Sequence, residues 1–402
     1  MRVSTSQFYL QSAQQMSQKT SEVNEQMAYL TSGKGVLTAK DNAVSYSTLV
    51  GFNDGLANIE KYKRNITQAE SHNNLQEVVF SNAENILNNI QEQMLQANSG
   101  AMSDEDLNTI AKQTRNSFQQ LLDAANSQNA NGDYIFSGYQ TQLPPFSQQT
   151  DGGVAYNGDS GLRELQVSKN INIPINQAGD AAFMKVDNAI GDFSANYTTN
   201  TSGVSLASAA ITDRNTYNSS ALPHDYTFSF DVITADLTVT DSGGNVVLPP
   251  APYVAGQSLA FDGIDVTLSG NHLPGDSFTM SEQEDISIFE TLNKAINWME
   301  QGSVGVNQAQ HQVDYNTLLN QLNSSMMHIT SRRVDSGIRL QTLESQKNSH
   351  LDAALNLASG KANIEDLDFA KAIGEFEQSK IALQASQQAF SKVQGLSLFN
   401  YI

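Results

Sequence analysis

The chain has 402 residues, with 42 acidic side chains against 22 basic ones, a net charge of −20 and no cysteine. This acidity excludes nucleic acid and anionic membrane as partners, because both attract basic patches. The missing cysteines exclude disulfides, zinc–thiolate sites and cysteine nucleophiles. Only 16% of residues are charged, so we expect helix faces that meet other subunits as well as water.

The first helix is expected over residues 6–31. Apolar side chains recur there at the alternating 4,3 spacing of a coiled-coil seam. Glycines at 33 and 35 should break the helix, and Asp41 and Asn42 can cap the next one. The seam positions are Tyr9, Ala13, Met16, Thr20, Val23, Met27 and Leu30.

Helical periodicity continues over residues 44–98 and again after the acidic run 104–106, which suits the positive end of a helix. It ends at the segment 131–139, which is rich in aromatic residues and glycine. All eight prolines then fall within 140–284, where short alternating stretches predict strands and Asp262-Gly263 predicts a hairpin turn.

Helical pattern returns at 285 and is expected to break at Gly360. The last segment carries Phe369, Ile373, Phe376, Leu383 and Phe390 at seam spacing. The fold class is therefore mainly α with a β-rich, sandwich-like insert, as a rod of long helices whose ends form coiled coils. The expected parts are 1–44 and 361–402 for the coiled coil, 45–139 and 285–360 for the helical rod, and 140–284 for the insert.

Candidate catalytic and metal sites are lacking in the sequence. The six histidines are scattered, with no His-Glu-x-x-His motif and no Gly-x-Ser-x-Gly elbow. Trp298, the single tryptophan, is interpreted as a core residue. No run of 18 apolar residues predicts a membrane span. We therefore expect no enzyme activity, no cofactor, no metal, no nucleic acid and no membrane partner.

Several motifs resemble one known family. The segment 131–139 reads Asn-Gly-Asp-Tyr-Ile-Phe-Ser-Gly-Tyr, the chain opens with Arg-Val-Ser-Thr-Ser over 2–6, and it closes with Gln-Gly-Leu-Ser-Leu-Phe over 394–399. Together they resemble the hook–filament junction proteins of bacterial flagella (hook-associated protein type 3), in the flagellin superfamily. The family usually continues the first break with Asp-Asp-Pro, and here Asp41 is followed by Asn42 and Ala43.

The resemblance implies a structural subunit in the extracellular flagellum that joins hook to filament, leaves through the flagellar export channel and is needed for motility. It also implies a homo-oligomeric ring, contacts with the larger hook-associated junction protein and with flagellin, and an export chaperone on the C-terminal helix. The alternatives are a flagellin and, from another class, a surface adhesin that acts through the β insert.

The two ends are expected to form the polymer interface. Their thin seams cannot offset the conformational entropy of ordering both segments, so they should be mobile alone and helical when neighbours cover them. The expected interface residues are Tyr9, Met16, Val23, Met27, Leu30, Phe369, Ile373, Phe376, Leu383, Phe390, Leu396, Leu398 and Phe399.

Overall fold

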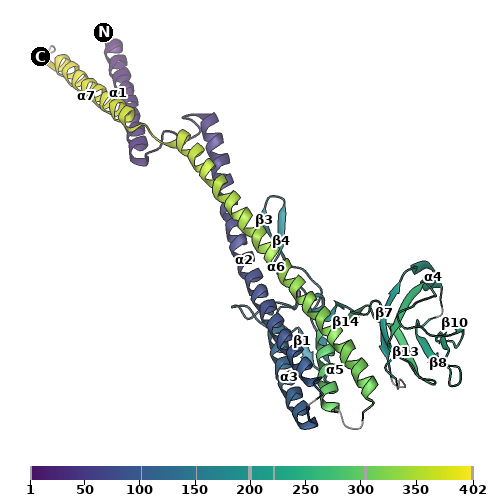
Figure 1. Cartoon of the computed structure of the whole chain (residues 1–402). Helices are drawn as coiled ribbons and strands as arrows, with labels where there is room; N and C mark the ends of the chain where they lie inside the picture. Colours follow the sequence, from purple (N-terminus) through teal and green to yellow (C-terminus); the bar gives the residue numbers. More distant parts are fainter. Residues whose placement is uncertain are drawn as a thin grey trace. The chain divides into compact units, whose positions relative to one another are not determined.

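The computed structural model describes residues 2–100, 102–150, 152–197, 202–220, 222–302 and 306–399. Its elements follow the chain in the order expected from the sequence, helices first, then strands, then helices (Figure 1). The helices are α1 (Arg2–Ser32), α2 (Ala43–Ala97), α3 (Asp104–Ala125), α4 (Arg214–Ser219), α5 (Ile288–Gln301), α6 (Gln308–Glu365) and α7 (Phe369–Phe399), with a π-helix, η1 (Asp180–Met184).

In the described residues, fourteen short strands pair antiparallel between these helices. They are β1 (Phe146–Gln148), β2 (Val154–Tyr156), β3 (Glu164–Ser168), β4 (Ile171–Pro174), β5 (Val186–Asp187), β6 (Phe193–Asn196), β7 (Ser205–Ile211), β8 (Tyr226–Phe230), β9 (Leu237–Thr240), β10 (Val246–Ala251), β11 (Ser258–Phe261), β12 (Ile264–Ser269), β13 (Ser277–Glu282) and β14 (Asp285–Ile286).

The chain divides into two compact units. One unit combines residues 1–64 with 345–402, and the other spans 65–344. The predicted fold class, helical ends around a β-rich insert, is confirmed. The five-part division made from the sequence stays a prediction.

Helix boundaries follow from local chemistry. At the start of α3 the Ser103 hydroxyl accepts the Asp106 amide, and the Asp106 carboxylate accepts the Ser103 amide, which makes a capping box. The side chain of Asn42 accepts the Ser45 amide at 3.0 Å, so it caps α2 without the proline. Helix α1 ends where Gly33 takes φ +67°.

The expected break at Gly360 is wrong, because α6 continues through it to Glu365. Gly360 lies against the ring of Phe52, and a Cβ there would sit 3.0 Å from the Phe52 Cζ atom. The glycine therefore permits a close helix–helix approach within the first unit, and it tolerates the helical backbone at a small cost.

The core of the 65–344 unit is an aromatic cluster. Phe183, in η1, packs against Phe136, Phe146 and Phe289 with ring centroids 5.2, 5.6 and 5.9 Å away, and Phe80 of α2 lies 6.1 Å away. All five rings are almost fully buried. They come from five separate elements, so this cluster joins helices α2 and α5 to the segments between α3 and β5. Trp298 is also buried, as predicted, and its Nε1 donates to the His311 carbonyl.

The 131–139 segment leads the chain from α3 to the first strands. Ile135 and Phe136 are buried in the core, while Tyr139 is exposed. Gly138 turns the chain with φ +70°, and the next amide, of Tyr139, donates to the Asp159 carboxylate. A Cβ at Gly138 would overlap the Asp159 backbone, so glycine is required there for both its φ angle and its size.

The insert has its own core between two sheets. The five-stranded sheet has the order β10-β9-β8-β13-β6, and the three-stranded sheet has the order β11-β12-β7. Alternate residues of β8 and β12 point inward, as the period-two pattern requires. The predicted hairpin is confirmed, with Phe261 opposite Ile264 and positive φ at Asp262 and Gly263.

We expect Gly138→Ala to destabilise the 65–344 unit far more than Gly132→Ala. Both glycines have positive φ, so either substitution should cost roughly 1–2 kcal/mol. Only the Gly138 substitution meets backbone atoms, since nothing lies within 4 Å of a Cβ at Gly132, and the overlap should add roughly 1–3 kcal/mol. Chemical unfolding followed by Trp298 fluorescence measures both, and equal losses would contradict the close approach.

Phe183→Ala should lower the free energy of unfolding of this unit by about 3–5 kcal/mol, because it leaves a cavity among the rings. The matched control is Phe369→Ala in the other unit, whose side chain is 52% exposed. This control should leave the Trp298 unfolding transition unchanged. A loss below about 1 kcal/mol for Phe183→Ala would show that the cluster is not the core.

Candidate assembly interface

Helices α1 and α7 form an antiparallel pair within the first unit (Figure 1). Near the free ends the rings of Tyr9 and Phe390 meet edge to face, with centroids 5.9 Å apart. At the other end the Leu367 amide donates to the Gly33 carbonyl at 3.1 Å. Contacts that join early residues to late ones at both ends require opposite helix directions.

An ion pair and backbone hydrogen bonds link the segment after α1 to the segment before α7. Lys34 Nζ lies 2.7 Å from Glu365 Oε1, and the Gly35 amide donates to the Glu365 carbonyl at 2.6 Å. The hydrogen bond from Lys34 is the main cause that lowers the pKa of Glu365. A short antiparallel bridge joins Lys34 to Asp366. The segment that follows α1 and the segment that precedes α7 therefore run side by side at this point.

Asp41 organises the loop between α1 and α2. Its Oδ2 atom accepts the amides of Leu37 and Thr38 at 2.9 and 2.8 Å. The Thr38 amide and the other donors lower the pKa of Asp41 from 3.8 to about 2. Burial, with a contribution from Asp41, raises the pKa of Tyr29 to about 12. A turn thus forms around Asp41, and Asn42 rather than a second aspartate caps the next helix, as expected.

The structure half-buries four of the five N-terminal candidates and brings Tyr9 into contact with Phe390 of α7. Tyr9, Met16, Val23 and Leu30 are half-buried, whereas Met27 is 48% exposed. Between the four contact residues lie Ser12, Lys19 and Gln26, which are also half-buried, while Ala13 and Thr20 are exposed. The stripe therefore follows 3,4 spacing rather than the predicted 4,3 spacing.

The same shift occurs in α7. Phe376, Leu383 and Phe390 are half-buried, and Ala372 is buried. Phe369 and Ile373 are each 52% exposed, although a Cβ at Gly33, the residue after α1, would lie 3.6 Å from the Phe369 Cζ atom. Leu396, Leu398 and Phe399 belong to the helix, but their side chains are outside the described part of the chain.

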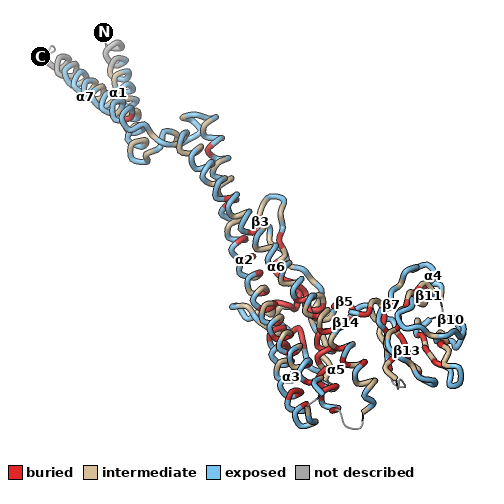
Figure 2. The backbone as a smooth tube through the Cα atoms, viewed as in Figure 1, coloured by how far each residue is buried: buried red, intermediate tan, exposed pale blue. Residues whose placement is uncertain are grey.

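Two exposed apolar residues were absent from the predicted interface. Leu10 in α1 is 64% exposed, and Ile381 in α7 is 62% exposed. Figure 2 shows the contrast between the two units, since the described residues of α1 and α7 are almost all intermediate or exposed and buried residues gather in the 65–344 unit. A search for every apolar residue off the seam would have found both.

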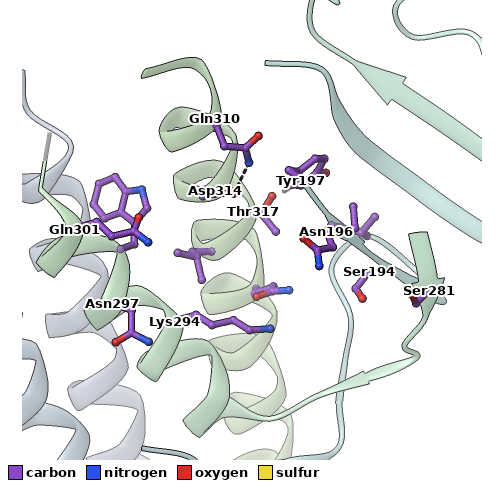
Figure 3. Close-up of a pocket in the computed structure, with 15 residues that line it drawn as sticks. Ser194, Asn196, Tyr197, Ser281, Lys294, Asn297, Gln301, Gln310, Asp314 and Thr317 are labelled. Carbon is purple, nitrogen blue, oxygen red and sulfur yellow. Dashed lines mark hydrogen bonds between the residues drawn. The ribbon is translucent and has the colours of Figure 1, made fainter. Parts of the chain in front are cut away.

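A polar cleft of about 780 Å³ lies in the 65–344 unit between strands β6 and β13 and helices α5 and α6 (Figure 3). Within it Gln310 Nε2 donates to Asp314 Oδ1 at 2.8 Å, and burial raises the pKa of Asp314. Its other polar lining is mainly amides and hydroxyls, so the cleft brings no nucleophile and base together. The lining includes Ser194, Asn196, Ser281, Lys294, Asn297, Gln301 and Thr317.

Among the described residues, no three metal-ligating side chains lie close enough together to hold a metal ion. In the same residues no helix has the length and apolar character to cross a membrane.

Comparisons with known proteins place the fold. Residues 3–141 match the bacterial flagellin N-terminal helical region, and 319–402 match the bacterial flagellin C-terminal helical region. Residues 195–282 match the D2-like domain of flagellar hook-associated protein 1. The chain is therefore of the flagellin type, with its two helical regions on either side of an insert.

Relatives that match this chain over most of its length show which family of the flagellin type it resembles. Flagellar hook-associated protein 3 of Escherichia coli K12 is 24% identical over 399 residues, 99% of each chain. The crystal structure of flagellar hook-associated protein 3 from Legionella pneumophila is 30% identical, with 78% of this chain and 98% of that one covered and a TM-score of 0.68. FlgL from Xanthomonas campestris, 21% identical with a TM-score of 0.64 over 77% of this chain and 99% of that one, shares the fold.

The chain belongs to the flagellar hook-associated protein 3 (FlgL) family. The resemblance seen in the 131–139 segment and at the two ends is confirmed. The family's members are structural flagellar proteins, which fits a chain without enzyme activity.

The Asp41 loop should lose stability as the pH falls from about 4 to about 2. The folded loop lowers the pKa of Asp41 from 3.8 to about 2, so the folded form binds fewer protons than the unfolded form in this window. The Asp41 carboxylate therefore stabilises the folded loop fully above pH 3.8, and this stabilisation is lost as the pH falls to about 2. Hydrogen-exchange protection of the Leu37 and Thr38 amides measures it.

The control is Asp41→Asn. Its side chain cannot titrate, so the protection of these two amides should stay constant between pH 4 and pH 2. If the protection of the wild-type amides stayed constant between pH 4 and pH 2, the carboxylate would not hold this loop.

Proposed function

We propose that this chain is a structural subunit of the extracellular bacterial flagellum, at the junction between hook and filament. The observation that carries the proposal is the match to hook-associated protein 3 over 99% of the chain, both helical ends included. A filament role is less well supported, because these full-length relatives are hook-associated proteins and the insert matches a hook-associated protein domain.

The function is that of an adaptor, so it rests on contacts with copies and neighbours. In this proposal a ring of copies lies between the larger hook-associated junction protein and flagellin. The subunits leave unfolded through the flagellar export channel, with an export chaperone on the C-terminal helix. The adhesin alternative keeps no specific support, because the insert has the fold of a flagellar domain.

The terminal helices supply the contacts in this proposal. Their mutual packing leaves Met27, Phe369 and Ile373 about half exposed, and Leu10 and Ile381 are more exposed still. Burial of such apolar side chains against a partner stabilises the complex by about 25 cal/mol per Å² of apolar area removed from water. We therefore assign Phe369 and Ile373 to contacts with neighbouring subunits. The half-buried residues of α1 and α7, which include Tyr9 and Phe390, are assigned to the contact within one chain.

Deletion of the gene should abolish motility and release flagellin into the medium, and expression of this chain should restore both. Against that background we expect Phe369→Ser with Ile373→Ser to prevent attachment of the filament, because the pair forfeits roughly 2–4 kcal/mol of apolar burial between subunits. Swimming assays and the flagellin content of the medium report it.

The control is Ile233→Ser, since Ile233 is 87% exposed on the insert and lies far from α7 in sequence. This variant should swim as the wild type does. Normal motility of the Phe369/Ile373 double variant would remove these residues from the interface, and a deletion strain that swam normally would contradict the junction role itself.

A further inference from the structure

The polar cleft of the 65–344 unit has an unpaired strand edge in one wall. Strand β6 is the last strand of the five-stranded sheet, and in the described residues it pairs with β13 alone. Ser194, Ala195 and Asn196 of this strand line the cleft. Figure 3 shows the strand on one side of the cleft and helices α5 and α6 on the other. The edge of a sheet offers unpaired amides and carbonyls to another chain.

The hydrogen bonds of β6 show which backbone groups point away from the sheet. The Asp192 carbonyl accepts the Gln283 amide at 2.8 Å, so Asp192 faces β13. The Phe193 carbonyl faces the other way and accepts Asn188 Nδ2 at 2.9 Å. Backbone groups alternate along an antiparallel strand, so those of Ala195 also point away from β13. Neither the amide nor the carbonyl of Ala195 has a partner among the described residues.

The opposite wall of the cleft also holds unpaired polar groups. Gln321 of α6 is 5% exposed, and its side-chain amide makes no hydrogen bond to another described residue. Oε1 of Gln310 is buried and likewise has no partner there, although Nε2 of the same side chain donates to Asp314. Buried polar groups without a partner are destabilising. A ligand that offers both donors and acceptors would remove that cost.

The cleft suits a ligand without charge. Two of its lining residues carry charged groups, and both already have partners. Lys294 pairs with Glu290 at 2.7 Å, and Asp314 accepts the hydrogen bond from Gln310 at 2.8 Å. The other polar lining residues carry hydroxyls and amides. A charged ligand would lose its hydration there without gaining an unpaired opposite charge.

We propose that the cleft binds an extended, uncharged segment of a partner protein, which adds to the edge of β6 as a sixth strand of the sheet. One edge of the added strand pairs with the backbone of Ala195, and its other edge meets the side-chain amides of the helices. Main-chain hydrogen bonds supply the affinity in this kind of recognition. The volume of about 780 Å³ lies within the range of about 300–1,000 Å³ of ligand sites.

Backbone chemistry identifies the occupant as a polypeptide. An extended chain presents amides and carbonyls in turn along both of its edges, and both walls of the cleft offer matching groups. Trp298 in the lining is 4% exposed and stacked on His311, so it offers no open ring face to a sugar. The exposed, uncharged segment 249–257 of this chain does not suit the site, because its three prolines have no amide hydrogen. We therefore assign the added strand to a different protein.

Synthetic peptides bound to the full chain test the site. The cleft belongs to the 65–344 unit alone, so this binding does not depend on the junction role. The probes are capped hexapeptides in which Val alternates with Ser, Thr, Asn or Gln. Trp298 fluorescence should report saturable binding, because this residue lines the cleft. The Ala195 amide should also gain hydrogen-exchange protection in the complex.

Ala195→Pro removes the free amide from the edge of β6. This amide has no partner in the described chain, and edge strands tolerate proline at such positions, so the variant should fold as the wild type does. Its affinity for the peptides should fall about tenfold or more, because the added strand loses main-chain hydrogen bonds.

The matched control is Ala260→Pro in β11, an edge strand of the three-stranded sheet. Phe261 and Ile264 flank the two-residue turn of this hairpin and form its first hydrogen-bonded pair, so the Ala260 amide also points away from its partner strand. Ala260 is exposed and lies outside the cleft lining. This control should bind the peptides as the wild type does.

A second variant leaves the strand intact. Gln321→Leu removes the unpaired amide from the helix wall, and we expect peptide affinity to fall about threefold or more. Its melting temperature should not fall, because the lost amide has no partner in the free protein. Loss of affinity without loss of stability separates a role in binding from a role in folding.

Three outcomes would overturn the proposal. One is peptide affinity that neither Ala195→Pro nor Gln321→Leu reduces, and another is failure of the wild-type chain to bind any of the peptides at millimolar concentration. Saturable binding of neutral oligosaccharides in place of the peptides would assign the cleft to glycans. Self-association of the wild-type chain that Ala195→Pro abolishes would replace the partner protein with a second copy.

Discussion

The packing of aromatic rings around Phe183 is the interaction on which the 65–344 unit depends. The rings come from α2, the 131–139 segment, β1, η1 and α5. Long helices such as α2 and α6 bury only one side against each other, so a core built by them alone would be thin. The rings contributed by the intervening segments thicken it, and they hold the path of the chain into and out of the insert.

The first unit lacks such a cluster among its described residues. Its aromatic contacts there are single pairs, stacked between Tyr62 and His350 and edge to face between Tyr9 and Phe390. The half-buried stripe between α1 and α7 includes Ser12, Lys19 and Gln26. In physical terms one unit carries its own core, and the other relies on apolar surface that its own chain covers in part. That division suits a subunit whose ends gain their final cover from neighbours.

Much of the fold could be predicted from the sequence, because the signals are local. Proline placement, the Asp262-Gly263 turn and the acidic start of α3 each act within a few residues. The shift of the seam could not be predicted. Tyr9, Met16, Val23 and Leu30 recur every seven residues in either register, and the choice of Ser12 over Ala13 depends on what α7 presents. The exception at Gly360 is of the same kind, since its reason, Phe52, is more than 300 positions away in the chain.

The lack of charge on the exposed residues of α2 between 67 and 89, and of α6 between 312 and 341, was visible in the sequence only as a low overall charge. Periodicity marks the buried side of a helix, but it does not separate residues that face water from residues that flank the core. Glu77, Glu84 and Arg333 lie among these residues in the sequence, and only their contacts show that they pair with each other between α2 and α6.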